Sequence, residues 1–188
     1  MIKLYGTRNS RAFRCLWALE ECGVPYELVP IDWQTGETRT PEFLAINPNG
    51  HVPVLQDGDL ILVESLAINL HIAQINPSSL SLDNPMETTK AIEWTTWAMG
   101  ELEGPHDAAN RSNSDVENKL RAQAMTVLDN HLDQTPYLIS ERFTMADLNV
   151  ASVLMRPKYM PHLWGCDRLQ DWFSRCASRP ALAKALAA

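Results

Sequence analysis

The chain has 188 residues, of which 45% are apolar, so it can form one large domain or two modest ones with a buried core. Its 16 Lys and Arg face 23 Asp and Glu, which gives a net charge of -7, and no basic run is present that would bind nucleic-acid phosphates. No apolar stretch approaches the ~20 residues that cross a membrane, and the start of the chain does not read as a signal peptide. Neither nucleic acid nor membrane is therefore an expected partner.

The cysteines predict neither a metal site nor a redox pair. Cys15, Cys22, Cys166 and Cys176 form no C-x-x-C motif, and no histidine lies at zinc-ligand spacing from them. Reduced, isolated thiols are typical of cytoplasmic proteins, where disulfides are rare. We therefore expect a cytoplasmic protein without a bound metal.

Strand and helix patterns alternate over the first 75 residues. An apolar stripe with helical spacing predicts a helix over residues 10–22, which Gly23 and Pro25 end. Asp57-Gly58 between two apolar runs predicts a β-hairpin. The expected order is strand 2–5, helix 10–22, strand 26–31, short helix 41–46, strands 53–56 and 60–63, and helix 65–75.

The second half of the chain reads as helical throughout. Residues 76–85 include Pro77 and Pro85 and have the composition of a linker, and strand patterns are absent after them. Helices are expected over residues 86–104, 114–132, 144–155 and 167–178, with a short tail over 181–186. The chain therefore divides near residue 80 into an α/β half and an all-helical half.

Two short segments of the α/β half could bind a ligand. Val52-Pro53 places a proline at the start of a strand, where it cannot donate to the ladder and where its peptide bond can be cis; a trans proline on an edge strand is the alternative. Ser65 is a natural N-cap, and its helix offers free N–H groups and a positive end to a carboxylate. Glu64 beside it can accept from an ammonium group, so the pair suits a zwitterionic amino-acid group, although an ordinary capped helix would also use Ser65.

Ser10 is the candidate for activating a sulfur nucleophile. It opens the first predicted helix, with Arg14 four residues on, and a hydroxyl there could donate to a thiolate that the helix dipole also stabilises. A simple N-cap is the alternative role. Tyr5, at the end of the first strand, competes with it, whereas Cys15 lies on the apolar stripe more than one turn into the helix. That position argues against thiol-disulfide exchange as the main activity.

The chain resembles the glutathione S-transferase family, in particular its bacterial-type cytosolic members with a serine-type active site. The resemblance is carried by the order of elements over residues 4–74, by the run N-P-N-G-H-V-P-V-L over 47–55, and by Glu64-Ser65. Thr144 and Asp147 form a variant capping box like the structural one in the second domain of that family. The resemblance implies an α/β thioredoxin-like N-terminal domain over 1–77 and an all-α helical C-terminal domain over 86–188.

The resemblance also implies roles for individual residues. Val52, before a cis Pro53, would pair its backbone with the cysteine part of glutathione, and Glu64 and Ser65 would hold the γ-glutamyl group. His51 would lie near the glycine carboxylate, with an exposed loop histidine as the alternative. Ser10, in preference to Tyr5, would stabilise the thiolate.

The function expected from the resemblance is a cytoplasmic, homodimeric glutathione transferase of detoxification. Glutathione would be the co-substrate, and the second substrate would be a small hydrophobic electrophile bound by the C-terminal domain, where Glu101, Glu103 and Pro105 could edge the site. Two alternatives stay open. One is a non-catalytic interaction module with the same fold, and the other is a glutathione-dependent peroxidase or reductase.

Overall fold

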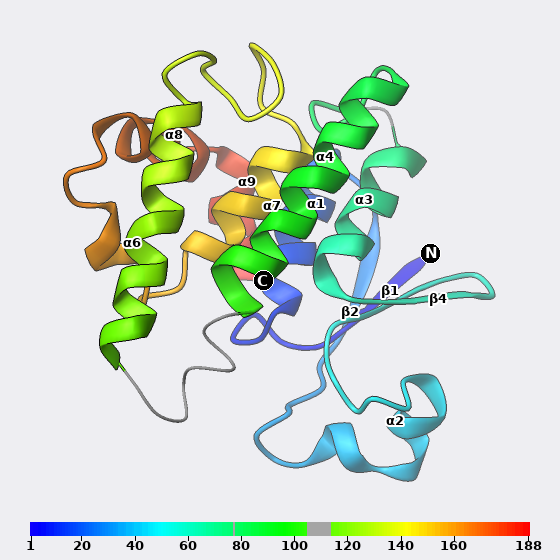
Figure 1. The fold of residues 1–188 in the computed structure, drawn as a ribbon. Coiled ribbons are helices and arrows are strands. Elements are labelled where there is room, and N and C mark those ends of the chain that lie inside the picture. Colours follow the sequence, from blue (N-terminus) through cyan, green and yellow to red (C-terminus); the bar gives the residue numbers. More distant parts are fainter. Residues whose placement is uncertain (77, 105–113) are drawn as a thin grey trace. The chain divides into compact units, whose positions relative to one another are not determined.

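The computed structural model describes residues 1–76, 78–104 and 114–188 of the chain (Figure 1). Two compact units divide it. The first comprises Met1–Ser81 together with Pro180–Ala188, and the second comprises Leu82–Arg179.

A four-stranded mixed sheet forms the centre of the first unit. Its strands are β1 (Ile2–Tyr5), β2 (Tyr26–Val29), β3 (Val54–Asp57) and β4 (Leu60–Val63), in the order β2-β1-β3-β4. β1 runs parallel to β2 and antiparallel to β3, which pairs with β4 through the predicted hairpin. Leu4 lies opposite Leu28 and Leu55, and both Leu4 and Leu55 are fully buried. The alternation of buried and exposed positions therefore directs one face of β1 into the core.

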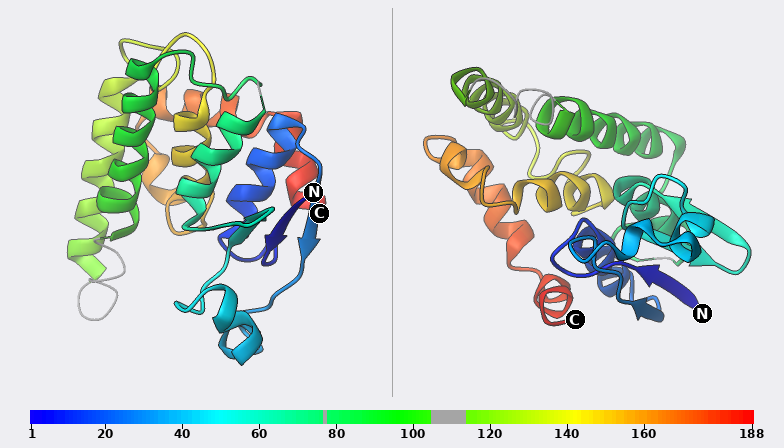
Figure 2. Two further views of the ribbon diagram at one scale, coloured as in Figure 1. Left: turned by 90° about the vertical axis from the view of Figure 1, so that its right-hand side faces the viewer. Right: turned by 90° about the horizontal axis from the view of Figure 1, so that it is seen from below.

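Three helices of the first unit pack together beside this sheet: α1 (Ala12–Cys22), α3 (Ser65–Ile75) and α9 (Pro180–Ala187). The short α2 (Pro41–Ile46) instead contacts the 3-10 turn Glu37–Arg39. α1 contacts both α3 and α9, and Figure 2 shows α1 and α9 side by side. The domain limits expected from the sequence place residues 180–188 in the helical half. The structure places them in the first unit, because Leu182 and Ala185 bury their side chains where α9 packs on α1.

In its described residues the second unit contains helices joined by turns and loops, and no strand. It contains α4 (Pro85–Trp97), a π-helical continuation (Ala98–Glu103), α6 (Ser114–His131), α7 (Met145–Leu154), a 3-10 turn (Met160–Leu163) and α8 (Asp167–Ala177). Every residue of α7 is buried, and α7 contacts α4 and α8. Asn149 Nδ2 donates to Thr95 Oγ1 at 2.9 Å and so links α7 to α4 within this core. Among the described helices, none combines the length and apolarity that a membrane crossing requires.

Several element boundaries differ from the sequence patterns, and three of them bear on the site. The second strand ends at Val29 instead of residue 31, because Pro30 cannot donate to the ladder. Similarly, β3 begins at Val54 and not at Pro53. α1 begins at Ala12 with Arg11 at the N-cap, so Ser10 precedes the helix that it was expected to open.

Candidate active site

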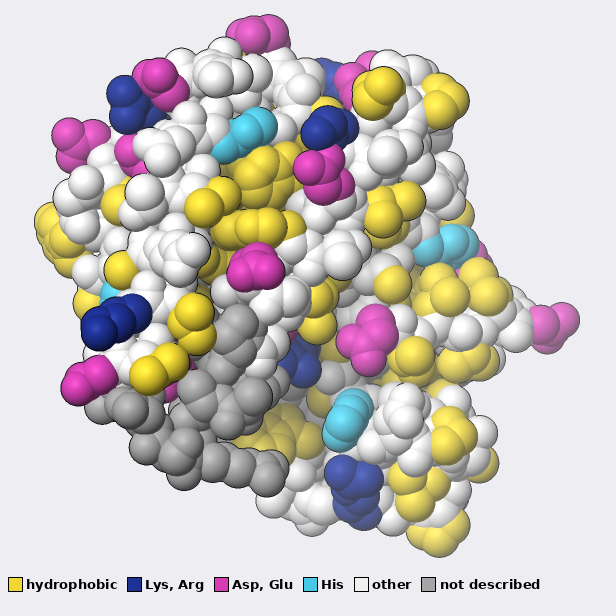
Figure 3. All heavy atoms as spheres, viewed as in Figure 1, with side chains coloured by type: hydrophobic (Ala, Val, Ile, Leu, Met, Phe, Trp, Pro, Cys, Tyr) yellow, Lys and Arg dark blue, Asp and Glu magenta, His cyan; other side chains and the backbone are white. Residues whose placement is uncertain are grey.

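A surface pocket in the first unit is built from three segments of the chain. They are the start of α1, the loop that leads into β3, and the junction of β4 with α3. The lining residues are Arg11, Asn47, Asn49, His51, Val52, Pro53, Val63, Glu64 and Ser65. Five of the residues predicted from the sequence therefore lie around one pocket. Figure 3 shows a histidine and a cationic side chain next to each other on the face of the molecule near α2.

The loop before β3 is held by a buried asparagine. Asn47 Nδ2 donates to His51 O at 2.8 Å, while its Oδ1 accepts from Asn49 N at 3.1 Å and its backbone O accepts from Gly50 N at 2.9 Å. Gly50 has a φ of 61°, and a Cβ atom there would lie 2.8 Å from Thr38 O. The Val52-Pro53 peptide at the end of this loop is cis, as the resemblance implies.

Asn47 is a pocket residue for which the sequence motifs predict no role. Its position in the run over 47–55 was the available signal, because a buried asparagine in a turn readily bonds neighbouring backbone groups. The three bonds fix the path of the chain from α2 to Val52. Asn47 therefore shapes the pocket as well as lining it.

Glu64 and Ser65 lie where β4 meets α3, but not in the expected arrangement. Glu64 is the N-cap residue and Ser65 is the first residue of the helix, so the prediction of Ser65 as the N-cap is wrong. The hydroxyl of Ser65 accepts from Arg14 Nη1 at 3.3 Å instead of capping the helix. No side-chain hydrogen bond from Glu64 caps α3, and the positive end of the helix dipole at this point favours an anion.

The backbone of Glu64 is strained. Its φ of 70° makes it the one non-glycine residue with a positive φ in the described part of the chain. A non-glycine residue in such a conformation costs on the order of 1–3 kcal/mol and is found most often at functional sites. The strain therefore marks the junction that carries two of the predicted ligand-binding residues.

The hydroxyl of Ser10 is engaged within its own turn. Ser10 Oγ donates to Thr7 O at 2.7 Å and accepts from Ala12 N at 3.1 Å, and Ser10 is not among the lining residues. It is nevertheless near the pocket. A Cβ atom at Gly6 would lie 3.4 Å from Ser10 Oγ and 3.3 Å from Val52 Cβ, so these two atoms are at most 6.7 Å apart.

Gly6 is required at this point of the fold. Its φ is 138°, and a Cβ atom there would lie 2.7 Å from Ala12 Cβ, closer than real Cβ contacts. The sequence pattern identifies Gly6 only as the end of the first strand. The close approach of α1 to Val52 depends on the missing side chain.

Neither of the two competitors of Ser10 lines the pocket. Tyr5 pairs with Val54 across the sheet, and its hydroxyl donates to Gln56 Oε1 at 2.8 Å, further along β3 from Val52. Cys15 is fully buried, its Sγ lies 3.5 Å from Ser65 O, and burial strongly raises the pKa of its thiol. A thiol that stays protonated is a poor nucleophile, so Cys15 packs as a small apolar side chain.

Arg11 is a pocket residue that sequence reasoning missed. It follows Ser10 directly, occupies the N-cap of α1 and lines the pocket together with Val52 and Glu64. A cation at the positive end of a helix is locally unfavourable. An arginine at the start of a predicted helix was therefore the signal in the sequence that could have identified Arg11 as a pocket residue.

The two acidic residues expected to edge the site of the second substrate, Glu101 and Glu103, differ in burial. Glu103 is buried and its Oε1 pairs with Arg156 Nη1 at 3.2 Å, which gives it a structural partner, whereas Glu101 is exposed. Pro105 lies outside the described residues. The described residues contain no group of three or more His, Cys, Asp or Glu side chains placed to hold a metal ion.

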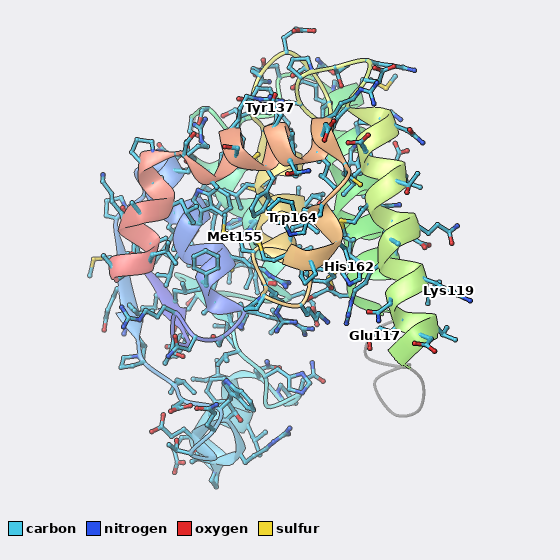
Figure 4. The ribbon with its side chains drawn as sticks, turned by 90° about the vertical axis from the view of Figure 1, so that its left-hand side faces the viewer. Glu117, Lys119, Tyr137, Met155, His162 and Trp164 are labelled. Atoms are coloured by element: carbon cyan, nitrogen blue, oxygen red, sulfur yellow. The ribbon has the colours of Figure 1, made fainter. Side chains whose placement is uncertain are left out.

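An exposed aromatic side chain marks the segment between α7 and α8. Figure 4 labels Met155, His162 and Trp164 on this segment, and Trp164 is 80% exposed. Burial, and to a smaller extent the charge of Arg121, lowers the pKa of His162. His162 is therefore a titratable group of the helical unit and lies apart in sequence from every lining residue of the pocket.

Two family models match the chain. Residues 1–74 match the glutathione S-transferase N-terminal domain, and residues 94–188 match the glutathione S-transferase C-terminal domain. The chain therefore belongs to the glutathione S-transferase family, and the expected pairing of a thioredoxin-like N-terminal domain with a helical C-terminal domain is confirmed.

Curated relatives match over nearly the whole chain. Glutathione S-transferase 3 of Zea mays is 34% identical over 211 residues, which covers 100% of this chain and 94% of the relative. Glutathione S-transferase GstB of Escherichia coli K12 is 30% identical over 201 residues, which covers 98% of this chain and 97% of the relative.

Solved structures agree with these relatives. Glutathione transferase F7 from Populus trichocarpa is 29% identical with a TM-score of 0.84, covering 98% of this chain and 97% of the other. Glutathione S-transferase I, solved with lactoylglutathione bound, is 32% identical with a TM-score of 0.83, covering 99% and 98%.

Proposed function

We propose that this chain is a glutathione transferase that uses glutathione as its co-substrate and transfers it to a small hydrophobic electrophile. The observation that carries the proposal is the pocket in the first unit, where Val52 before a cis proline, Glu64 and Ser65 come together. The relatives named glutathione S-transferase and the structure solved with lactoylglutathione support the choice of ligand.

The charges around the pocket fit the two ends of the tripeptide. Glu64 offers a carboxylate to the γ-glutamyl ammonium, and the first N–H groups of α3, beside Ser65, offer donors to the γ-glutamyl carboxylate. Val52 would hold the cysteinyl part through its backbone. His51, which lines the pocket, would approach the glycine carboxylate as a hydrogen-bond donor.

Ser10 is the candidate hydroxyl at the sulfur. Its Oγ lies no more than 6.7 Å from Val52 Cβ, so a cysteinyl group paired with Val52 would place its sulfur in the same neighbourhood. To donate to a thiolate, Ser10 would have to turn its proton away from Thr7 O. Tyr5 is the weaker candidate because its hydroxyl donates to Gln56.

The setting of the activity is also a proposal. Residues of the helical unit would bind the electrophile, the active species would be a cytoplasmic homodimer, and the physiological role would be detoxification. The curated glutathione S-transferases with which the chain aligns over nearly its full length support this setting. Burial of the Cys15 thiol argues against a disulfide reductase, because that chemistry needs an accessible thiolate.

Titration of bound glutathione tests the proposal. Thiolate absorbance in the ultraviolet is followed against pH with and without saturating ligand, and conjugation of an activated aryl chloride is measured in parallel. We expect a bound-thiol pKa well below the ~8.5 of free cysteine, together with conjugation. Saturable binding with an ordinary pKa and no conjugation would instead identify a carrier or interaction module, and turnover of hydroperoxides alone would identify a peroxidase.

A further inference from the structure

The N-terminal end of α1 carries an excess of positive charge. Arg11 occupies the N-cap, Arg14 lies in the first turn, and this turn contains no acidic residue. The helix dipole adds a positive partial charge of about half an elementary charge at the same end. The N-terminal end of a helix is an unfavourable place for cations. Two arginines at this end therefore add to the dipole and create a positive potential at one edge of the pocket.

The two arginines lie in different surroundings: Arg14 is in the interior, and Arg11 is at the pocket. Arg14 is 2% exposed, and its Nη1 donates to Ser65 Oγ across the unit. Arg11 is partly exposed and lines the pocket beside Val52, Glu64 and Ser65. Arg11 is therefore the guanidinium at this end of α1 that a bound ligand would meet.

Ser10 cannot supply a proton to a ligand without breaking a bond that it already makes. A serine hydroxyl has one proton, and here that proton is donated to Thr7 O at 2.7 Å, while Ala12 N donates to the same oxygen. Both bonds stabilise the turn that places Arg11 at the N-cap. In this geometry the residue next to Ser10 is better equipped to meet a negative charge.

We propose that the guanidinium of Arg11 stabilises the glutathione thiolate, and that Ser10 acts mainly by holding the turn that presents Arg11 to the pocket. This inference rests on the proposed function. The thiol proton leaves to solvent when the ligand binds, and no covalent bond to the protein forms. A guanidinium has five N–H donors, so Arg11 can keep a protein partner and still donate to a sulfur anion.

The expected effect follows from the charges that face the sulfur. A positive charge within about 4–6 Å lowers the pKa of an acidic group, such as a thiol, by about 1 to 3 pH units. Glu64 works against this effect from the β4–α3 junction. Arg14, and Arg39, which donates to Asn49 O on the loop, work with it. Without Arg11, fewer positive charges would offset the carboxylate of Glu64, so the pKa of the bound thiol would rise.

The experiment compares Arg11→Ala with a matched control. Arg8→Ala removes an exposed arginine of the same turn, which donates to Leu186 O and does not line the pocket. Three readouts are taken from each folded variant: the pKa of the bound glutathione thiol, protons released on binding at neutral pH, and affinity for S-methylglutathione, which has no thiol.

Loss of Arg11 is expected to raise the bound-thiol pKa by about 1 to 3 pH units and to reduce proton release, with S-methylglutathione affinity changed less than about threefold. Arg8→Ala leaves all three values unchanged, Ser10→Ala raises the pKa by less than Arg11→Ala does, and Arg11→Lys restores part of the effect.

Three outcomes would overturn the inference. An unchanged thiol pKa in Arg11→Ala would show that Arg11 does not interact with the ionised sulfur. A large loss of S-methylglutathione affinity with an unchanged thiol pKa would assign Arg11 to a carboxylate of the ligand. An equal rise of the bound-thiol pKa in Arg8→Ala would show that the effect comes from the net surface charge and not from Arg11 itself.

Two further results keep the inference separate from the proposed function. If Arg11→Ala does not fold, Arg11→Gln removes the charge with a smaller loss of packing and decides the same question. Failure of the wild-type protein to bind S-methylglutathione would refute the proposed function itself.

Discussion

Replacement of Asp147 by asparagine tests how the helical unit is held together. Asp147 is fully buried at the start of α7, next to the N-cap Thr144. Its Oδ1 accepts from Leu138 N and Trp172 Nε1, both at 2.9 Å, and its Oδ2 accepts from Thr144 N at 2.9 Å and Thr144 Oγ1 at 3.0 Å. Burial raises the pKa of this carboxyl and the four hydrogen bonds act in the opposite direction. Only the ionised form can accept all four bonds.

The magnitude follows from the donors that asparagine would leave unpaired. Asp147→Asn keeps the shape of the side chain but turns one acceptor oxygen into an NH2 group that faces two donors. Each buried donor without an acceptor costs about 1–3 kcal/mol, and the remaining two bonds lose the contribution of the charge. We therefore expect a loss of about 3–5 kcal/mol, which at about 2–4 °C per kcal/mol lowers the Tm by about 6–20 °C.

Thermal and denaturant unfolding measure this change, with Asp171→Asn as the control. Asp171 lies on α8, is 75% exposed and pairs across the surface with Arg175. Exposed pairs contribute about 0–1 kcal/mol, so the control should stay close to wild type. Below the transition, Asp147→Asn should still bind glutathione, because the pocket belongs to the other unit. A stability within 1 kcal/mol of the control would refute the four-donor account.

Three further changes test the first unit and the pH response. Gly6→Ala would force a Cβ atom to within 2.7 Å of Ala12 Cβ at a φ of 138°, so we expect lower stability and weaker glutathione binding by calorimetry; an unaltered affinity would contradict this. Asn47→Ala removes two side-chain bonds of the loop, and we expect about tenfold weaker glutathione binding with a smaller change in Tm, because each bond contributes about 0.5–1.5 kcal/mol. The pKa of His162 is lowered in the folded state, so the folded protein binds this proton less readily than the unfolded chain does, and stability is lost as the pH falls below ~6.5. His162→Gln should reduce that loss in denaturant unfolding at pH ~5.5 relative to ~7.5, and equal losses would exclude His162 as its source.

Local patterns in the sequence were sufficient for most elements of the fold. The hairpin around Asp57-Gly58 and the buried helix α7 follow from turn chemistry and from capping by Thr144. The placement of α9 could not be predicted in this way. Its partner α1 lies at the other end of the chain, and an apolar face on a short helix does not reveal which surface it covers.

Most of the predicted binding residues line the pocket, but the hydrogen bonds that their side chains make could not be predicted from the sequence. Val52, Glu64 and Ser65 come together because the chain order of a hairpin followed by a helix brings β3 and α3 to the same end of the sheet. The direction of the Ser10 proton depends on where Thr7 O points after the turn has formed. The sequence pattern makes Ser10 a helix opener, and only the three-dimensional turn makes Arg11 the N-cap.

The two helix ends at the pocket differ in charge, and this difference bears on how a ligand is oriented. The end of α3 offers N–H groups together with the carboxylate of Glu64, which suits a group that carries both an anion and an ammonium. The end of α1 offers positive charge alone, from Arg11 and from the helix dipole, which suits a single anion. Glutathione has one end of the first kind, and its ionised sulfur is of the second kind. A tripeptide bound in the reverse direction would place its glycine carboxylate, and no ammonium, against the carboxylate of Glu64, so the charges favour one orientation before any contact with the electrophile is made.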